Sequence, residues 1–354
     1  MKVTSIPPLG SSAGSDLRHI FMTLLMLTAS IIHGAEPVSI IFDTDFESDA
    51  DDVAALALLH YFEQQNEVRI LAIATCGLHA LSAPAVNAVN HHFGRPNIPV
   101  GVRRGSGFDR DSNYTRFLVD QFPAAFDSDS APDSVTLYRQ ILAAQPDNTV
   151  TIVSVGYLTN LSDLLKTGPD EYSDLTGREL VAAKVARYFC MGGSYPKQSR
   201  TGAWGNFLPD PEAVIHVNRD WPTPIVYTGG TTFSRSVPSG RGFVEEFPAD
   251  SMLRQTYEVF FERTSWAKGP DHHSADLIPV YIAARGFEPF FKETKTGSNH
   301  IFPDGTMEWR IEPDRRDRYY VFDLDAGING KLVGRQFEAW IRDAETTATK
   351  LSRR

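Results

Sequence analysis

The sequence predicts an α/β fold, a single domain in which a mostly parallel, open sheet is flanked by helices in a Rossmann-like arrangement. Two observations predict it. Short apolar runs recur along the chain with helix-like segments between them, and such alternation favours parallel strands buried on both faces. An acid-rich segment, 43–52, directly follows the first of these runs. Open α/β sheets bind ligands at the carboxyl ends of their strands, so this segment stands where a site is expected.

The expected elements follow the apolar runs in order. The strands are expected at Val38–Phe42, Val68–Thr75, Ile98–Val102, Val150–Val155, Arg187–Met191 and Pro224–Thr228. Helices are expected at Val53–Phe62, Ala83–Phe93, Ser134–Ala144 and Asn160–Lys166. Near the end, Asp304-Gly305 lies between apolar residues and predicts a hairpin, and Gly334–Ile341 predicts a closing helix.

Composition limits the classes of function. A chain of 354 residues can form one large domain or two small ones, and no low-complexity linker divides it. The net charge of −10 argues against a nucleic-acid partner and favours a small neutral or cationic ligand. The two cysteines, Cys76 and Cys190, lie in strand-like contexts, so burial is expected and not a disulfide. CxxC and HExxH patterns are absent from the sequence, which argues against zinc.

The first 35 residues differ from the rest. Lys2 and Arg18 precede an apolar or small-residue run, 20–32, and Ala35 follows as a cleavage point. This pattern predicts a signal peptide over residues 1–35 and export of a domain comprising residues 36–354. The alternative, a membrane anchor, would have to cross the bilayer with thirteen residues, which is too short.

The acid-rich segment contains six carboxylates within ten residues. Crowded carboxylates either share protons or hold a metal ion, and ligands that are all oxygen suit calcium or magnesium. Asp51 and Asp52 are expected on the first turn of a helix, where the dipole favours negative charge. A solvated acidic loop is the plain alternative. An EF-hand is excluded, because Ser48 and Ala54 stand where its loop requires glycine and glutamate.

Four segments together resemble the inosine-uridine-preferring nucleoside hydrolase family, from about residue 38 to at least residue 286. They share the family's order and spacing, with a longer first loop. The segments are Asp43-Thr44-Asp45 with Asp49-Ala50-Asp51-Asp52, Ser154 to Leu161, Met191-Gly192-Gly193 with Asn206-Phe207 and Asp210 to Ala213, and Ser274-Ala275-Asp276. The resemblance implies hydrolysis of the N-glycosidic bond of ribonucleosides or related ribosides, giving ribose and a free base.

The resemblance also implies roles for individual residues. It implies a Ca²⁺ ion held by Asp45, Asp52, Asp276 and the carbonyl of Val155, with Asp45 taking a proton from the attacking water. Asp51 and Asn206 match residues that grip ribose hydroxyls. The longer loop leaves Asp49 as an alternative to Asp51, and Asp43 is assigned to orienting the site. Taken alone, Asp276 would more often be a helix cap.

Several features of the family pattern are missing. Ala203-Trp204-Gly205 stand where an acid usually precedes Asn206, Leu78 replaces an asparagine, and Ala275 replaces a histidine that protonates the base. His273, His272 or His79 could supply a proton, although exposed loop positions are the plainer expectation for them. Trp204 would stack on a base or cover the pocket.

These losses motivate an alternative function, a non-catalytic, calcium-dependent sugar or nucleoside binding protein. A phosphatase that uses an Asp-Thr-Asp nucleophile is a third reading, and it does not account for the Leu158-Thr159-Asn160 segment. The expected partner is a small riboside, without nucleic acid or stable membrane insertion after processing. Relatives often form homo-oligomers, which the sequence does not decide.

Overall fold

The computed structural model describes residues 36–193, 205–229, 231–267, 269–292, 297–312, 314, 317–321 and 323–352. From Pro37 onward, the described residues group as one compact unit. The expected signal peptide therefore lies outside the described residues. None of the described helices combines the length and the apolar character that crossing a bilayer requires.

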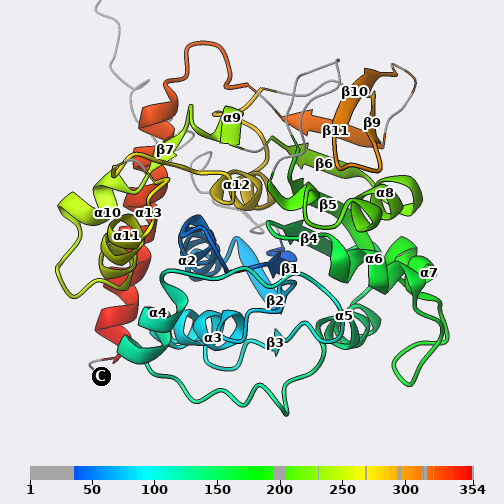
Figure 1. Cartoon of the computed structure of the whole chain (residues 1–354), viewed down its shortest axis with the longest axis horizontal. Helices are drawn as coiled ribbons and strands as arrows, with labels where there is room; N and C mark the ends of the chain where they lie inside the picture. The colour runs from blue at the N-terminus through cyan, green and yellow to red at the C-terminus, as the bar shows by residue number, and fades with distance from the viewer. Residues whose placement is uncertain are drawn as a thin grey trace, which may run out of the picture. The chain divides into compact units, whose positions relative to one another are not determined.

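The central sheet has seven parallel strands in the order β11-β6-β5-β4-β1-β2-β3 (Figure 1). They are β1 (Val38–Thr44), β2 (Val68–Thr75), β3 (Val100–Gly101), β4 (Val150–Ser154), β5 (Val185–Met191), β6 (Ile225–Thr228) and β11 (Arg318–Val321). Strand β1 lies inside the sheet, between β2 and β4. All six predicted strands are confirmed, with β3 shorter than expected. The edge strand β11 was not predicted.

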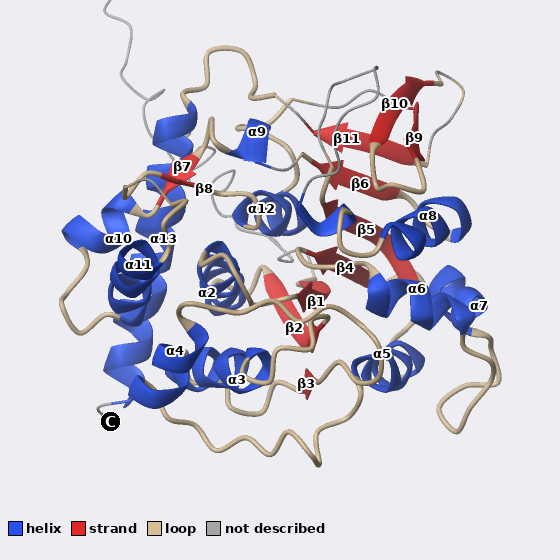
Figure 2. Ribbon diagram, in the orientation of Figure 1, coloured by secondary structure: helices blue, strands red, loops and turns tan. Residues whose placement is uncertain are grey.

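Helices cover both faces of the sheet (Figure 2). They are α2 (Asp51–Gln64), α3 (Ser82–His92), α4 (Thr115–Gln121), α5 (Ser134–Ala143), α6 (Thr159–Lys166), α7 (Gly177–Lys184), α8 (Pro211–Asp220), α9 (Thr231–Ser234), α10 (Arg241–Glu246), α11 (Met252–Arg263), α12 (Leu277–Arg285) and α13 (Gly330–Ser352). Helices α2, α3 and α12 lie on one face and α5 to α8 on the other. The predicted α/β class is confirmed.

Two small antiparallel pairs accompany the sheet. Strands β9 (Gly297–Ile301) and β10 (Met307–Ile311) form the hairpin that Asp304-Gly305 predicted. Strands β7 (Pro238–Ser239) and β8 (His272–His273) form the second pair. The expected closing helix is present as α13 and is longer than predicted.

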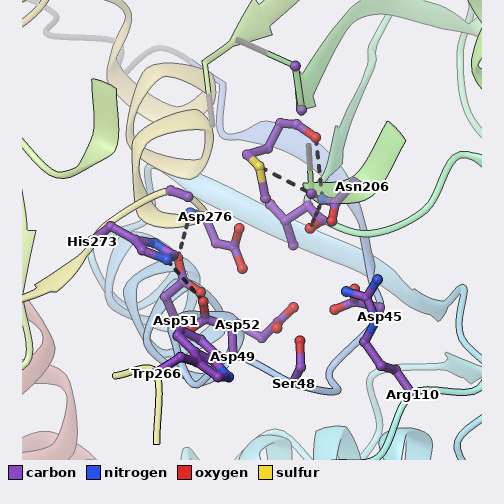
Figure 3. Close-up of a pocket in the computed structure, with 16 residues that line it drawn as sticks. Asp45, Ser48, Asp49, Asp51, Asp52, Arg110, Asn206, Trp266, His273 and Asp276 are labelled. Atoms are coloured by element: carbon purple, nitrogen blue, oxygen red, sulfur yellow. Dashed lines mark hydrogen bonds and ion pairs between the residues drawn. The ribbon is translucent and has the colours of Figure 1, made fainter. Parts of the chain in front are cut away.

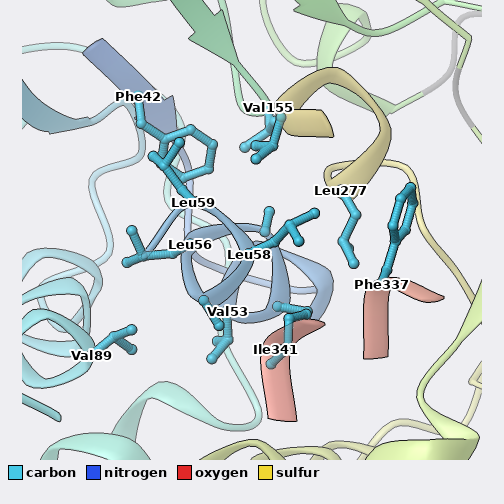
Figure 4. Close-up of a cluster of buried hydrophobic side chains, with 14 of the residues drawn as sticks. Phe42, Val53, Leu56, Leu58, Leu59, Val89, Val155, Leu277, Phe337 and Ile341 are labelled. Atoms are coloured by element: carbon cyan, nitrogen blue, oxygen red, sulfur yellow. The ribbon is translucent and has the colours of Figure 1, made fainter. Parts of the chain in front are cut away.

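The core is divided by the sheet into two apolar clusters, because successive residues of a strand face opposite sides. Ile40 and Phe42 pack with the helices on the α2 side, whereas Ile41 packs with those on the α5 side. Helix α2 is buried along almost its whole length, and Leu56, Leu58 and Leu59 point in different directions into the cluster (Figure 4). A helix surrounded in this way holds its first turn rigidly at the edge of the sheet.

Candidate active site and metal centre

A cavity of about 350 Å³ opens at the carboxyl ends of β1, β4 and β5 (Figure 3). Five aspartates line it together with polar, aromatic and apolar groups from distant parts of the chain. They include Asp45, Asp49, Asp51, Asp52, Asp276, Val155, Asn206, His273, Trp266 and Arg110. The predicted residues Asp45, Asp51, Asp52, Val155, Asn206, His273 and Asp276 all line this cavity, whereas Asp43, His79 and His272 do not. Trp204 lies outside the described residues.

The end of β1 separates the two acids of the Asp43-Thr44-Asp45 motif. The strand ends at Thr44, and Phe46 has a positive φ of 52° in a buried turn. Asp43 accepts hydrogen bonds from Tyr138 Oη and Asn160 Nδ2, each at 3.0 Å. Asp45 instead lines the cavity. Because the strand ends at Thr44, Asp43 and Asp45 lie in different surroundings although they are only two residues apart.

The first turn of α2 supplies two further carboxylates. Asp51 and Asp52 are its first residues, and the preceding Ala50 makes no side-chain cap. The Thr44 hydroxyl donates a hydrogen bond to Asp52 Oδ1, which ties the end of the strand to the helix. The predicted placement of both acids on the first turn is confirmed, and the partial positive charge of the helix N-terminus favours their ionised forms.

Asp276 comes from the distant segment before α12. It occupies the N-cap position, yet its side chain makes no capping hydrogen bond. Its backbone N–H donates to Asp51 Oδ2 at 3.2 Å. Its own Oδ1 is buried without a hydrogen-bond partner, which is rare for a carboxylate oxygen and which a cation site would explain. The helix-cap alternative is therefore wrong.

The carboxylates converge closely enough to share a cation. One oxygen each from Asp51, Asp52 and Asp276 lie within 4.8 Å of one another, and all three residues are buried. Burial raises the pKa of Asp276 and of Asp52 well above the usual range, and neighbouring carboxylates add to both shifts, Asp45 foremost for Asp52. Such repulsion is relieved by a divalent ion, and an all-oxygen set suits calcium or magnesium.

Asp45 lies in a buried environment rich in carboxylates. Burial raises its pKa to about 8, and the Glu47 carboxylate adds to the shift, whereas the Arg110 guanidinium opposes it. Glu47 is itself buried and accepts a hydrogen bond from Tyr157 Oη at 2.7 Å. A base with a pKa near neutrality accepts a proton efficiently at physiological pH.

The two adjacent histidines are buried and ion-paired, contrary to the expectation of exposed loop positions. Asp49 contacts His272 Nε2 at 2.6 Å and His273 Nε2 at 3.1 Å. His273 Nδ1 lies 3.3 Å from Asp51 Oδ2. Burial disfavours the imidazolium, but Asp49 and Asp51 outweigh burial and raise the pKa of His273 to about 10. His79 does not line the cavity and instead bonds to Thr115.

Asn206 and Val155 lie on the opposite wall. The amide nitrogen of Asn206 donates to the Val155 carbonyl at 2.5 Å. A carbonyl oxygen has two lone pairs, so this bond leaves Val155 able to accept a second partner. The short 3₁₀ turn Gly205–Phe207 holds Asn206 in place, with Phe207 fully buried beneath it.

Sequence reasoning missed three residues of the site. Arg110 lines the cavity next to Asp45, Trp266 forms part of the far wall, and Glu47 supports the Asp45 turn. Glu47 was visible as one of the six acids. Arg110 lies in the loop between β3 and α4, and Trp266 lies in the loop between α11 and β8. No local sequence pattern indicates which side chains of such loops reach the pocket.

The fold is a parallel sheet flanked by helices, and buried aspartates gather at the carboxyl ends of its strands. Together these features define an α/β protein whose candidate divalent-cation site faces a small-molecule pocket. The sequence model of the inosine-uridine preferring nucleoside hydrolase family matches residues 40–317. The chain belongs to this family. Buried carboxylate clusters of this kind are typical of a metal site in it. No curated protein matches the chain.

Solved structures share the fold at low sequence identity. A plant nucleoside hydrolase has a TM-score of 0.64 at 17% identity, covering 88% of this chain and 99% of its own. A purine-preferring ribonucleoside hydrolase from Gardnerella vaginalis has a TM-score of 0.66 at 15% identity, covering 87% and 99%. An inosine-uridine preferring nucleoside hydrolase from Bacillus anthracis has a TM-score of 0.62 at 16% identity, covering 87% and 98%.

Proposed function

We propose that this protein hydrolyses the N-glycosidic bond of ribonucleosides or related ribosides in a calcium-dependent reaction, giving ribose and the free base. The observation that carries the proposal is the convergence of Asp276 with the acids of the β1–α2 turn, more than two hundred residues earlier, in one buried cluster. Neither a solvated loop nor helix capping requires this convergence. Family membership supplies the class of reaction.

The residues that would hold calcium are Asp45, Asp52, Asp276 and the carbonyl of Val155. All four line the cavity, and Asp276 Oδ1 is buried without a hydrogen-bond partner. Asp52 and Asp276 belong to the close group with Asp51, whereas Asp45 lies outside that group. The bound ion would make a water molecule more acidic and would neutralise the crowded carboxylates. Asp43 would support the site indirectly, because it accepts hydrogen bonds from Asn160 and Tyr138 behind the strand.

Asp45 would remove the proton from the attacking water, because it lines the cavity beside the other acids and a bound cation would favour its ionised form. As the glycosidic bond breaks, the ribose ring develops oxocarbenium character, which the surrounding carboxylates stabilise. Asp51 and Asn206 would bind the ribose hydroxyls. We assign this role to Asp51 and not to Asp49, because Asp49 is held between two histidines.

The alternative is a calcium-dependent sugar or nucleoside binding protein without turnover. Ala275 stands at the position of a base-protonating histidine, and both ring nitrogens of His273 face carboxylates. A protein that lacks a proton donor for the base could bind without cleaving. Aglycones that depart without protonation would remain substrates.

Product chromatography after incubation with calcium and a panel of ribosides separates the two functions. We expect ribose and free base from the wild-type protein. The Asp45→Ala variant should retain its fold and lose at least a thousandfold in turnover, on the order of the effect of removing a general base together with a metal ligand. Saturable ribose binding without product from any riboside would favour the binding protein. Unchanged turnover in Asp45→Ala would reject the role of that residue.

We further propose that residues 1–35 are removed as a signal peptide and that the mature domain is exported, to the periplasm or the extracellular space. The apolar run 20–32 and Ala35 support this. That this protein forms homo-oligomers, as its relatives often do, stays a prediction. N-terminal sequencing of the exported protein should begin at Glu36.

A further inference from the structure

A second cavity, of about 490 Å³, adjoins the active-site cavity. The two cavities share Trp266 and His273 as lining residues. On its far side the second cavity is lined by Arg235, Lys331 and Asp271, which come from the turn after α9, the start of α13 and the loop before β8. The proposed reaction uses none of these three residues.

The second cavity carries the opposite charge to the first. Asp271 pairs with Arg241, whose guanidinium contacts both carboxylate oxygens at 3.0 and 3.1 Å and also contacts Glu245. Arg235 and Lys331 are exposed and form no ion pair within the part of the chain that the structure describes. The lining therefore has two unpaired cations, whereas five aspartates line the neighbouring pocket. A ligand that spans both cavities would need an anionic group at its outer end.

The side from which water attacks the anomeric carbon determines which end of the substrate faces the second cavity. If Asp45 activates the water directly, the water attacks the anomeric carbon from the face opposite the departing group. Asp45 and Arg110 lie at one end of the pocket, and Trp266 and His273 lie at the other (Figure 3). The aglycone therefore lies toward Trp266, which separates the two cavities.

The wall between the cavities can hold an aromatic ring, and its histidine His273 is engaged by two aspartates. Trp266 is 51% exposed, so a ring face is available for stacking. His273 directs both ring nitrogens to carboxylates, and Ala275 has no donor. On this side, within the described residues, the site favours an aglycone that departs without being protonated.

Building on the proposed N-riboside hydrolysis, we propose that the preferred substrate is the riboside of a quaternary nitrogen heterocycle bearing a carboxylate, which Arg235 and Lys331 bind in the second cavity. The bond between the anomeric carbon and the ring nitrogen breaks, and its electron pair neutralises the pyridinium-type nitrogen. The water oxygen bonds to the anomeric carbon, and one water proton passes to Asp45. The products are ribose and the heterocyclic carboxylate, without a general acid.

Nicotinic acid riboside and nicotinamide riboside form a matched pair of substrates, because both are pyridinium ribosides and only the first carries a carboxylate. We expect wild-type kcat/KM to be about tenfold higher for the acid, a gain typical of a pair of charge-assisted contacts. In Arg235→Gln/Lys331→Gln, kcat/KM for the acid should fall about tenfold, through KM. The amide should change less than about twofold. An exposed control, Lys166→Gln, should change neither.

An unchanged ratio of acid to amide in the double variant would overturn the proposal. A third substrate, nicotinamide riboside 5′-phosphate, tests the other end of the ligand. If the double variant weakens turnover of this phosphate and leaves the ratio of acid to amide unaltered, the cations serve the sugar side and the aglycone assignment is wrong.

A binding measurement separates this inference from the proposed function. Calorimetry with calcium, ribose and the Asp45→Asn protein should give tighter binding of nicotinate than of nicotinamide, and the double variant should abolish the difference. If ordinary ribonucleosides are cleaved but nicotinate gains nothing from Arg235 and Lys331, the inference fails and the hydrolase stands. If no riboside is cleaved but the nicotinate preference is present, the hydrolase fails and the anion site stands.

Discussion

At the scale of single residues, the site concentrates carboxyl groups that the protein keeps out of water. Burial raises the pKa of Asp45 to about 8 and the pKa values of Asp43 and Glu47 to about 7. Nothing in ordinary folding requires acids to be buried together, because each one costs stability when it ionises. The acids are therefore the feature of the molecule that a bound cation explains most directly.

These raised pKa values predict how the stability of the metal-free protein depends on pH. Their folded-state pKa values exceed the unfolded ones, so the folded state binds more protons, and stability falls as pH rises through them. Buried His60 acts oppositely, because burial lowers its pKa to about 3, but its effect is complete above its ordinary value of 6.5. With chelator present, we expect the melting temperature to fall between pH 6.5 and 8. A rise over that window would contradict the electrostatics described here.

Residue-scale sequence reasoning found the acids but not their partners. Asp45, Asp52 and Asp276 were recognisable because the first two lie in a dense motif and the third follows a matching segment. The pairing of Asp49 with His272 joins residues 223 positions apart, and no periodicity reports such a contact. Exposure was expected for the histidines because a loop position gives no sign of a buried charge partner.

At the scale of elements, the site depends on how closely three strand ends approach. Gly156 follows β4 and lies against the backbone nitrogen of Asp45 and the sulfur of Cys76. A Cβ atom at this position would overlap with both atoms. The glycine therefore sets the distance between the β1 and β4 ends, and with it the position of the Asp45 turn relative to Val155.

Gly156→Ala should push the Asp45 turn away from β4. We expect a loss of about 1–3 kcal/mol in the free energy of unfolding, as for other overpacked sites, together with reduced hydrolysis. Urea denaturation measures the first effect, and product chromatography measures the second. Gly168→Ala is the matched control, because a Cβ there meets no atom within 4 Å. Equal behaviour of the two variants would show that the close approach is unimportant.

Most elements were predictable, and the exceptions have a common cause. Interior strands such as β1 and β4 are rich in apolar residues and buried almost throughout, since both faces are covered. Edge strand β11, Arg318-Tyr319-Tyr320-Val321, begins with a charged residue and pairs on one side with β6 alone. Its strand conformation depends on pairing with β6 in the folded chain, and the sequence of β11 alone does not predict this pairing.

At the scale of the whole molecule, the site joins the first and last parts of the domain. Asp52 belongs to the turn after the first strand, whereas Asp276 precedes α12, which packs on α2. A ligand bound by both segments binds the folded state and not the unfolded chain. Its binding free energy therefore adds to stability.

Calcium should accordingly raise the melting temperature of the wild-type protein in a concentration-dependent way. Asp276→Asn removes one charged ligand, so we expect the calcium-dependent shift to fall to less than about half, since loss of a ligand weakens binding severalfold or more. Asp147→Asn, an exposed aspartate paired with Lys184, is the control and should retain the full shift. Equal shifts in the two variants would place the calcium elsewhere.

The central claim is that calcium held between the two segments is required for cleavage of an N-ribosidic bond. The most direct test is the rate of base release from ribosides by the protein after chelation and dialysis, measured before and after calcium is restored. The account predicts release that is negligible without calcium and recovers when calcium is added. Release that persists undiminished in the metal-free protein, or that is absent for every riboside when calcium is present, would contradict it.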